Sequence, residues 1–167
     1  MQRHFMTDMD ALGSWQPPPP NVPYGLATFG AQFAEAVDPD LGVVRVRRMV
    51  GAFAPGRILN ARTAHSQVMG GMLWGLGQAL LEGSLVDTRD GRWANASLGE
   101  YLVPVNADAP DVDIEFVEVT DTVVNPLGVK GLGEVGMVGA AAAIANAVFH
   151  ATGYRARELP IRIEHLL

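Results

Sequence analysis

Two apolar segments rich in glycine and alanine constrain the fold of this chain more than any other feature. They cover residues 68–81 and 135–151, and both are shorter than the roughly 20 residues that a membrane-spanning helix requires. We therefore expect both segments to form buried helices of a soluble protein, and we expect no membrane partner.

Cap signals set the expected ends of these two helices. The first should begin near Arg62 or Thr63, run to about Glu82 and be closed by Gly83, because glycine readily adopts the backbone conformation that ends a helix. The second should cover residues 136–152 and end at Gly153 for the same reason.

The glycines inside the first helix need an explanation, because each costs about 1 kcal/mol relative to alanine. Gly71 and Gly75 are four residues apart, so they share one face and allow another backbone or a ligand to approach closely. One interpretation is tight packing against another helix, which this segment alone favours. The other is that the start of the helix lies against a flat cofactor, with the amide of Gln67 pointing at an oxo or pterin group.

The remaining elements favour an α+β fold. We expect an antiparallel pair of strands at residues 29–37 and 43–50, joined by a turn at 38–42. Another strand is expected at residues 111–120, where the alternation slips by one residue at Val117. Strands and helices do not alternate regularly, so strands packed with two glycine- and alanine-rich buried helices fit better than a doubly wound sheet. Shorter extended pieces are expected at residues 85–91 and 101–105.

The N-terminal region differs from the rest of the chain. Residues 1–23 are expected to be a linker or a non-homologous N-terminal segment, because they end just after a run of prolines that cannot join the interior of a sheet or helix. One folded domain, residues 24–167, should follow. A chain of 167 residues is long enough for one hydrophobic core and short for two.

Composition excludes several classes of function. The net charge of −6 argues against a nucleic-acid partner, because phosphate binding requires a basic face. The absence of cysteine excludes a disulfide framework, a thiolate zinc site and an iron–sulfur cluster held by this chain. The histidines are scattered along the sequence, so we do not expect a metal held by side chains of this chain.

The most informative stretch is the glycine-rich loop at residues 125–139. Its five glycines between residues 128 and 139 allow the backbone to lie against a ligand, and it runs straight into an alanine-rich helix whose amides favour an anion. Residues 131–136 fit the GxGxxG pattern of dinucleotide-binding proteins. That interpretation fails, because the pattern requires a strand directly before it and Asn125-Pro126 interrupts that position.

Glu134 is the one carboxylate among these glycines. As a catalytic base it would be kept ionised by the start of the helix and could accept a proton. A glutamate that caps the free amides of the helix is at least as good an interpretation of the bare sequence. Lys130 lies four residues earlier, where it would either pair with Glu134 or face solvent.

Three blocks of the chain together resemble the molybdenum subunits of the xanthine dehydrogenase and aldehyde oxidase family. The nearest likeness is to bacterial three-subunit aldehyde dehydrogenases that use molybdopterin cytosine dinucleotide. The blocks are FGAQFAEAVDPDLGVVRVRRMVGAFAPGRILN (29–60), SQVMGGMLWGLGQALLEG (66–83) and the stretch from GEYLVPVNADAPDVDIEFVE to NPLGVKGLGEVGMVGAAAAIANAVFHATG (99–153), followed by RELPI (157–161).

The resemblance implies roles for particular residues. It makes Glu134 the active-site base of a hydroxylase that uses water as the oxygen source, and it places Gln67 close to the cofactor. The backbone of Gly131, Leu132 and Gly133 would line the same site. The implied cofactor is molybdopterin with molybdenum, in its cytosine dinucleotide form in the nearest likeness, with iron–sulfur clusters and FAD on partner subunits.

The resemblance also implies that other parts are needed. A whole molybdenum subunit of the family is several times longer, so we expect this chain to work only with the remainder of that subunit and to be inactive alone. A non-catalytic remnant or interaction module that binds no cofactor and self-associates is the alternative, and a small enzyme with another cofactor is a third. The sequence leaves open whether the substrate is an aldehyde, a purine or another N-heterocycle, and whether the protein is cytoplasmic or periplasmic.

Overall fold

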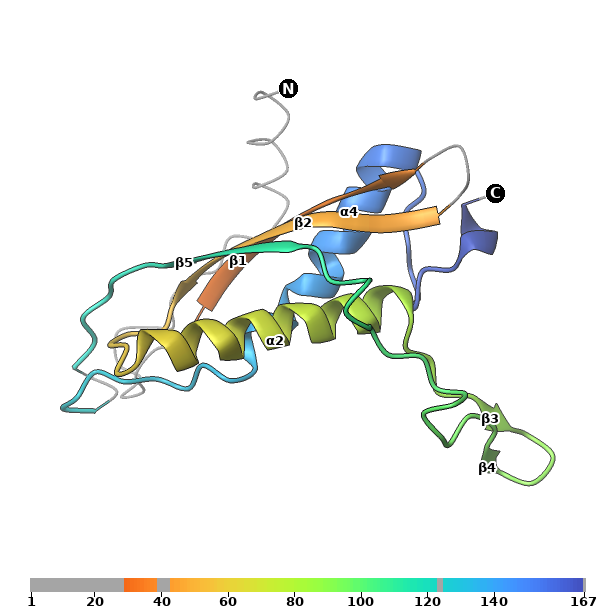
Figure 1. Ribbon diagram of the computed structural model, residues 1–167, viewed down its shortest axis with the longest axis horizontal. Coiled ribbons are helices and arrows are strands. Elements are labelled where there is room, and N and C mark those ends of the chain that lie inside the picture. The colour runs from red at the N-terminus through yellow and green to blue at the C-terminus, as the bar shows by residue number, and fades with distance from the viewer. Residues whose placement is uncertain (1–28, 39–42, 123–124, 167) are drawn as a thin grey trace, which may run out of the picture.

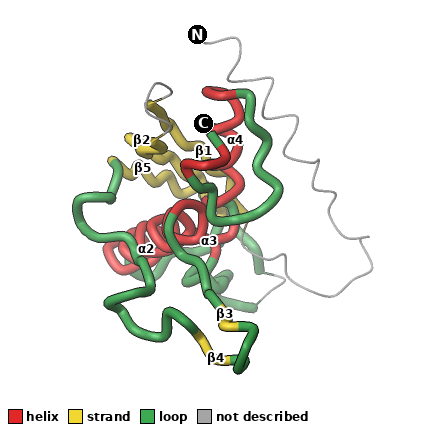
Figure 2. The backbone as a smooth tube through the Cα atoms, turned by 90° about the vertical axis from the view of Figure 1, so that its right-hand side faces the viewer, coloured by secondary structure: helices red, strands yellow, loops and turns green. Residues whose placement is uncertain are grey.

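The computed structural model describes residues 29–38, 43–122 and 125–166. A three-stranded sheet forms one layer, and the two long helices lie together on one side of it (Figures 1 and 2). This arrangement is α+β, as the sequence predicts. The interface between the layers holds a single cluster of buried side chains, contributed by Val46, Met49, Phe53, Val68, Met72, Leu76, Ala140 and Ile144.

The sheet has the order β1-β2-β5. Strand β1 (Phe29–Asp38) pairs antiparallel with β2 (Val43–Ala54), which confirms the predicted antiparallel pair, whereas the expected turn at 38–42 lies largely outside the described residues. Strand β5 (Asp111–Phe116) pairs parallel with β2. The prediction of a strand to residue 120 is wrong beyond Phe116, because the slip in the alternation at Val117 marks the end of β5 and not a bulge within it. The N–H of Val117 still donates to the carbonyl of Phe53, at 2.8 Å.

Helix α2 (Ala61–Leu80) is the glycine-rich helix of the sequence. Its start is capped by Asn60, whose Oδ1 accepts from the N–H of Thr63 at 3.1 Å. Its end differs from the prediction of Gly83 as cap. The N–H groups of Leu81 and Glu82 both donate to the carbonyl of Gly77, at 2.9 and 2.8 Å, and this closes the helix before Gly83 is reached.

The second predicted helix is divided in two. Helix α3 (Val135–Val138) is a single turn, and α4 (Ala140–Thr152) follows after Gly139. Gly153 ends α4 in the left-handed conformation, with φ of 77°, as predicted. A short 3-10 helix, η2 (Ile163–His165), lies near the C-terminal end.

Length and composition would allow the segment Val135–Thr152 to cross a membrane, with a mean hydropathy of 1.5. The core helix of a soluble protein passes the same test, and 28% of this segment is buried. Ala140, Ile144 and Val148 of α4 are almost fully buried. One face of α4 therefore serves as a core surface against the sheet and α2.

Glycines allow α2 to approach α3 and α4 closely. A Cβ atom added to Gly75 would lie 2.4 Å from the Cβ of Ala140, and one added to Gly71 would lie 3.0 Å from the backbone nitrogen of Met137. A Cβ on Gly136 would lie 2.4 Å from the carbonyl oxygen of Val68. No side chain fits at such distances, so tight helix packing is the role of these glycines.

Residues 83–110 form an arm that projects from the end of α2 (Figure 1). It contains a small hairpin of β3 (Val86–Asp87) and β4 (Arg92–Trp93), while residues 101–105 form no strand. The arm is attached to the domain by Tyr101, whose hydroxyl donates to Glu82 at 3.0 Å. The same hydrogen bond raises the pKa of the Tyr101 hydroxyl.

Candidate functional site

The glycine loop passes along the first turns of α2 on its way to α3 and α4 (Figure 1). Glu134 is the last residue before α3, and its side chain is exposed. It makes no side-chain hydrogen bond to the amides of that helix, so the interpretation of Glu134 as a capping residue is wrong. The expectation of a long helix behind the loop is also wrong, because α3 is one turn and Gly139 separates it from α4.

Gln67 and the glycine loop lie side by side. Gln67 is on the second turn of α2, and its side chain is exposed. A Cβ atom added to Gly133 would have Gln67 Oε1 as its nearest neighbour, at 3.7 Å. The structure therefore brings together Gln67 and the residue that directly precedes Glu134, although the two are far apart in the sequence.

The loop backbone faces open space at this point. A Cβ atom added to Gly131 would meet no heavy atom within 4 Å, and both Gly131 and Gly133 are exposed. Leu132, between them, is half-buried and packs against the core cluster. The leucine thus holds the loop on the domain while the glycines on either side leave its surface uncovered.

A shallow cavity of about 280 Å³ adjoins this surface at the start of α2. Gln67 and Leu132 both line it, together with Asn60 and Thr63 from the beginning of the helix. Glu134 is not among its lining residues. The cavity and the open glycine backbone together form a surface on which a flat, polar molecule could lie.

These residues fit an organic cofactor better than a metal held by side chains. In the part of the chain that the structure describes, no group of three or more histidine, cysteine, aspartate or glutamate residues could hold a metal ion. The amide of Gln67 offers both a donor and an acceptor, and a glycine backbone without side chains lets a ligand reach its polar atoms. A pterin has ring nitrogens and oxygens of the kind that such groups bind.

Lys130 does neither of the things that the sequence suggests for it. Its Nζ lies 2.9 Å from Oδ2 of Asp121, and the two side chains are only 4% and 11% exposed. Lys130 therefore pairs with Asp121, away from solvent, and the expected pairing with Glu134 is wrong. Sequence reasoning missed Asp121, because it lies nine positions before Lys130 and no spacing rule joins the two residues.

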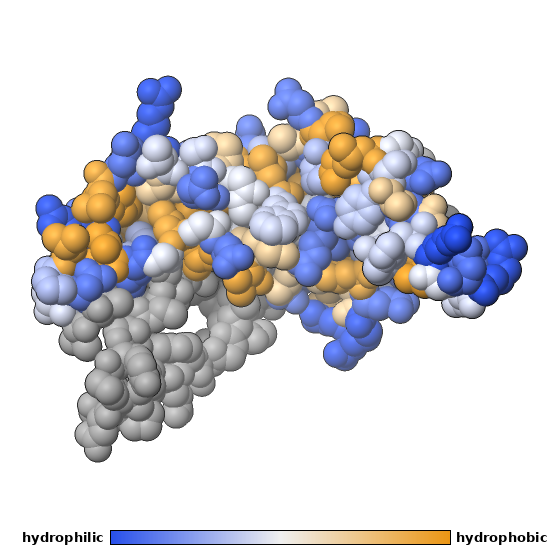
Figure 3. All heavy atoms as spheres, turned by 90° about the horizontal axis from the view of Figure 1, so that it is seen from below, coloured by the Kyte–Doolittle hydropathy of each residue, from blue (hydrophilic) through white to orange (hydrophobic). Residues whose placement is uncertain are grey.

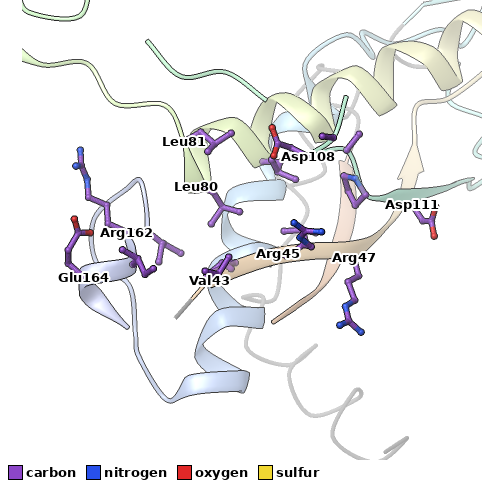
Figure 4. Close-up of a pocket in the computed structure, with 17 residues that line it drawn as sticks. Val43, Arg45, Arg47, Leu80, Leu81, Asp108, Asp111, Arg162 and Glu164 are labelled. Carbon is purple, nitrogen blue, oxygen red and sulfur yellow. The ribbon is translucent and has the colours of Figure 1, made fainter. Parts of the chain in front are cut away.

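A second cavity, of about 640 Å³, lies at the other end of β2 (Figure 4). It is bounded by Arg45 and Arg47 of β2, by the end of α2 and by the C-terminal segment around Arg162. None of the residues singled out in the glycine loop or at the start of α2 lines it. It is therefore separate from the candidate site.

Comparison with known proteins identifies the family. Residues 3–110 match the molybdopterin cofactor-binding domain family. The chain is 48% identical over 145 residues to the molybdenum-binding subunit of an aldehyde oxidoreductase from Escherichia coli K12, covering 86% of this chain and 20% of that subunit. It is 37% identical over 139 residues to a putative xanthine dehydrogenase molybdenum-binding subunit of the same organism, covering 83% and 18% of the two chains.

A solved structure supports the same family assignment. The crystal structure of the aldehyde oxidoreductase from Desulfovibrio desulfuricans aligns with a TM-score of 0.74 and 31% identity, over 84% of this chain and 15% of that protein. The chain thus spans about a fifth of the length of the relatives it matches. The family match includes most of residues 1–23, and a domain start near Tyr24 stays a prediction. The chain belongs to the family of molybdopterin cofactor-binding domains, and it is similar to molybdenum-binding subunits.

Proposed function

We propose that this chain supplies the catalytic base and part of the cofactor-binding surface of a molybdenum hydroxylase. The reaction is the oxidation of an aldehyde, or of an N-heterocycle, with water as the oxygen source. The observation that carries the proposal is the approach of Gln67 to Gly133, the residue directly before Glu134, whose own side chain is exposed. Relatives named for aldehyde and xanthine oxidation support the substrate classes.

The cofactor would rest on the start of α2 and on the glycine loop. Gln67 would hydrogen-bond to it through the side-chain amide, and Gly131, Leu132 and Gly133 would do so through the backbone. When bound, molybdopterin supplies the redox centre that accepts electrons from the substrate. The cytosine dinucleotide form is part of the proposal, supported by the likeness to bacterial aldehyde dehydrogenases.

Glu134 would act as the proton acceptor. Its carboxylate is exposed and makes no bond to the amides of α3, so it is available to a substrate or water held on the neighbouring surface. Leu132, two residues earlier, packs against the core and limits how far the loop can move. A positioned general base contributes about 10²- to 10⁴-fold to a rate.

We propose that the partners are the remainder of a molybdenum subunit and, beyond it, iron–sulfur and flavin subunits. Large apolar side chains reach the surface among polar ones (Figure 3), and Trp74, Leu102 and Val138 are 54%, 61% and 78% exposed. In this proposal the remainder of the molybdenum subunit covers these side chains. The chain alone would then bind no cofactor and have no activity.

The test is to produce the chain with and without the remaining part of a related molybdenum subunit, in a host that makes the cofactor. Molybdenum and pterin are measured in both preparations, and aldehyde oxidation is measured in the assembled one. We expect metal only in the assembled protein. Glu134→Gln should lower kcat about 100-fold or more while leaving the molybdenum content unchanged.

Glu115→Gln is the matched control, because Glu115 is an exposed carboxylate on β5, outside the candidate site. This variant should keep the parent activity. Full activity in Glu134→Gln would contradict the assignment of the base. If neither preparation contained molybdenum or pterin, the chain would instead be a non-catalytic module that keeps the fold.

A further inference from the structure

We propose that Asp121 and Lys130 form a positioning pair that fixes the glycine loop against the start of α2. The inference rests on the proposed function only in that the loop carries the base, Glu134. Lys130 lies in the loop, four residues before Glu134, and Asp121 precedes the loop. The pair would act through the backbone without touching the substrate.

The burial of this pair sets it apart from the exposed ion pairs. Lys130 and Asp121 are 4% and 11% exposed, whereas Arg48 and Asp113, which lie 2.6 Å apart across β2 and β5, are 56% and 57% exposed. Removing two charges from water costs several kcal/mol per ion, so a buried pair is weak evidence for stability. What distinguishes the buried pair is that it holds the chain at Asp121 and the chain at Lys130 in a fixed geometry.

Asp121 and Lys130 lie on either side of a tightly bonded stretch, residues 125–129. Asn125 lies inside it and donates from Nδ2 to the carbonyl of Val129 at 2.7 Å. Its Oδ1 accepts from the N–H groups of Leu127 and Val129, at 3.1 and 3.3 Å. The ion pair joins the residues on either side of this stretch, because Asp121 precedes Asn125 and Lys130 follows Val129. Residues 125–130 are therefore held by both backbone and side-chain contacts.

The loop is also fixed to the segment that leads into α2. The N–H of Arg57 donates to the carbonyl of Gly128 at 2.8 Å, and Gly56 forms a β-bridge with Val129. Gly56 and Gly128 both have positive φ, of 71° and 68°, and a Cβ on Gly56 would lie 2.4 Å from the carbonyl oxygen of Gly128. Glycine is required here for the two backbones to meet.

Lys130 is the last residue of this fixed part. Its Cγ would lie 3.4 Å from a Cβ at Gly56, so the aliphatic part of the side chain covers that contact while the ammonium reaches Asp121. Gly131, which follows directly, has open space beside its Cα atom, and a Cβ on Gly133 would be in ordinary contact with Gln67 Oε1 at 3.7 Å. The glycines give the loop freedom to change its path, and the ion pair fixes the point from which that path begins.

The experiment separates positioning from stability. In the first variants, Lys130→Met and Asp121→Asn, one charge of the pair is removed. In the second, Asp121→Leu is combined with Lys130→Met, since replacing a buried pair by apolar side chains is often neutral for stability. Amide hydrogen exchange of residues 125–136 and thermal unfolding are measured on the full chain, and kcat and KM on the assembled enzyme. Arg48→Met with Asp113→Leu is the matched control on the exposed pair.

We expect the single variants to lower the melting temperature. In the double apolar variant the melting temperature should return towards that of the parent, while the loop amides still exchange about tenfold faster or more. We further expect a lower kcat at nearly unchanged KM, and no such changes in the control. Parent exchange rates and parent kcat in the double apolar variant would overturn the inference.

The two proposals fail in different ways. Full activity in Glu134→Gln would rule out Glu134 as the catalytic base. Faster exchange of the loop amides in the double apolar variant would still show that the ion pair fixes the loop. If the loop amides exchanged at the parent rate in the double apolar variant while Glu134→Gln was inactive, the positioning role of the pair would be ruled out. The assignment of Glu134 as the base would stand.

Discussion

Glycine serves two different purposes in adjacent parts of this molecule. Where α2 meets α3 and α4, a Cβ atom on Gly75 or Gly136 would lie 2.4 Å from another heavy atom. In the loop directly before α3, a Cβ on Gly131 would meet nothing within 4 Å, and one on Gly133 would meet only Gln67, at 3.7 Å. The first group is buried and the second exposed.

This difference shows how the same residue type can mark a packing contact or a binding surface. A glycine that leaves no room for a side chain is required by the fold, because the backbones on both sides are in contact. A glycine with open space beside it is not required for packing. For Gly131 and Gly133, we propose that the space beside the backbone serves the approach of a cofactor. Substitution by alanine separates the two groups.

The largest effect is expected for Gly136→Ala. Its added methyl group would lie 2.4 Å from the carbonyl oxygen of Val68, a backbone atom that cannot move without shifting α2. Overpacking of this kind costs about 3 kcal/mol of unfolding free energy. Chemical denaturation of the full chain measures it. An unchanged midpoint would show that α2 and α3 are not in close contact.

A smaller effect of opposite sign is expected for Gly70→Ala. Gly70 neighbours Gly71 in α2, but it is exposed and a Cβ there would meet nothing within 4 Å. Alanine favours a helix over glycine by about 1 kcal/mol, so the unfolding free energy should rise by up to that amount. The same denaturation curve checks this variant, and a loss of stability would mean that Gly70 also packs against another group.

The sequence predicts those elements that depend on signals between neighbouring residues. The antiparallel pair of β1 and β2, the start of α2 and the end of α4 at Gly153 all follow from periodicity and cap residues. The prediction of Gly83 as a cap is wrong, because the carbonyl of Gly77 accepts from both Leu81 and Glu82 and ends the helix earlier. Cap signals compete with such bonds, and the sequence does not show which prevails.

Contacts between distant segments were harder to predict. The parallel pairing of β5 with β2 depends on how the intervening helix and arm return the chain to the sheet. The approach of Gln67 to Gly133 was expected only through the family resemblance, since 65 residues separate them in the sequence. The burial of Lys130 against Asp121 had no signal at all, because a lysine in a loop is usually solvated.

The smallest effect on stability is expected for Gly133→Ala, and this variant tests the open surface directly. Its Cβ would be in ordinary contact with Gln67 Oε1, so the unfolding free energy should change by less than about 0.5 kcal/mol. The methyl group would nevertheless occupy the space that we assign to the cofactor, so the pterin and molybdenum content of the assembled enzyme should fall. Gly99→Ala is the control, because Gly99 is exposed on the arm and its Cβ would lie 3.6 Å from Ser97 Oγ. If Gly133→Ala kept full pterin content, the open glycines would have to be explained by loop conformation and not by cofactor binding.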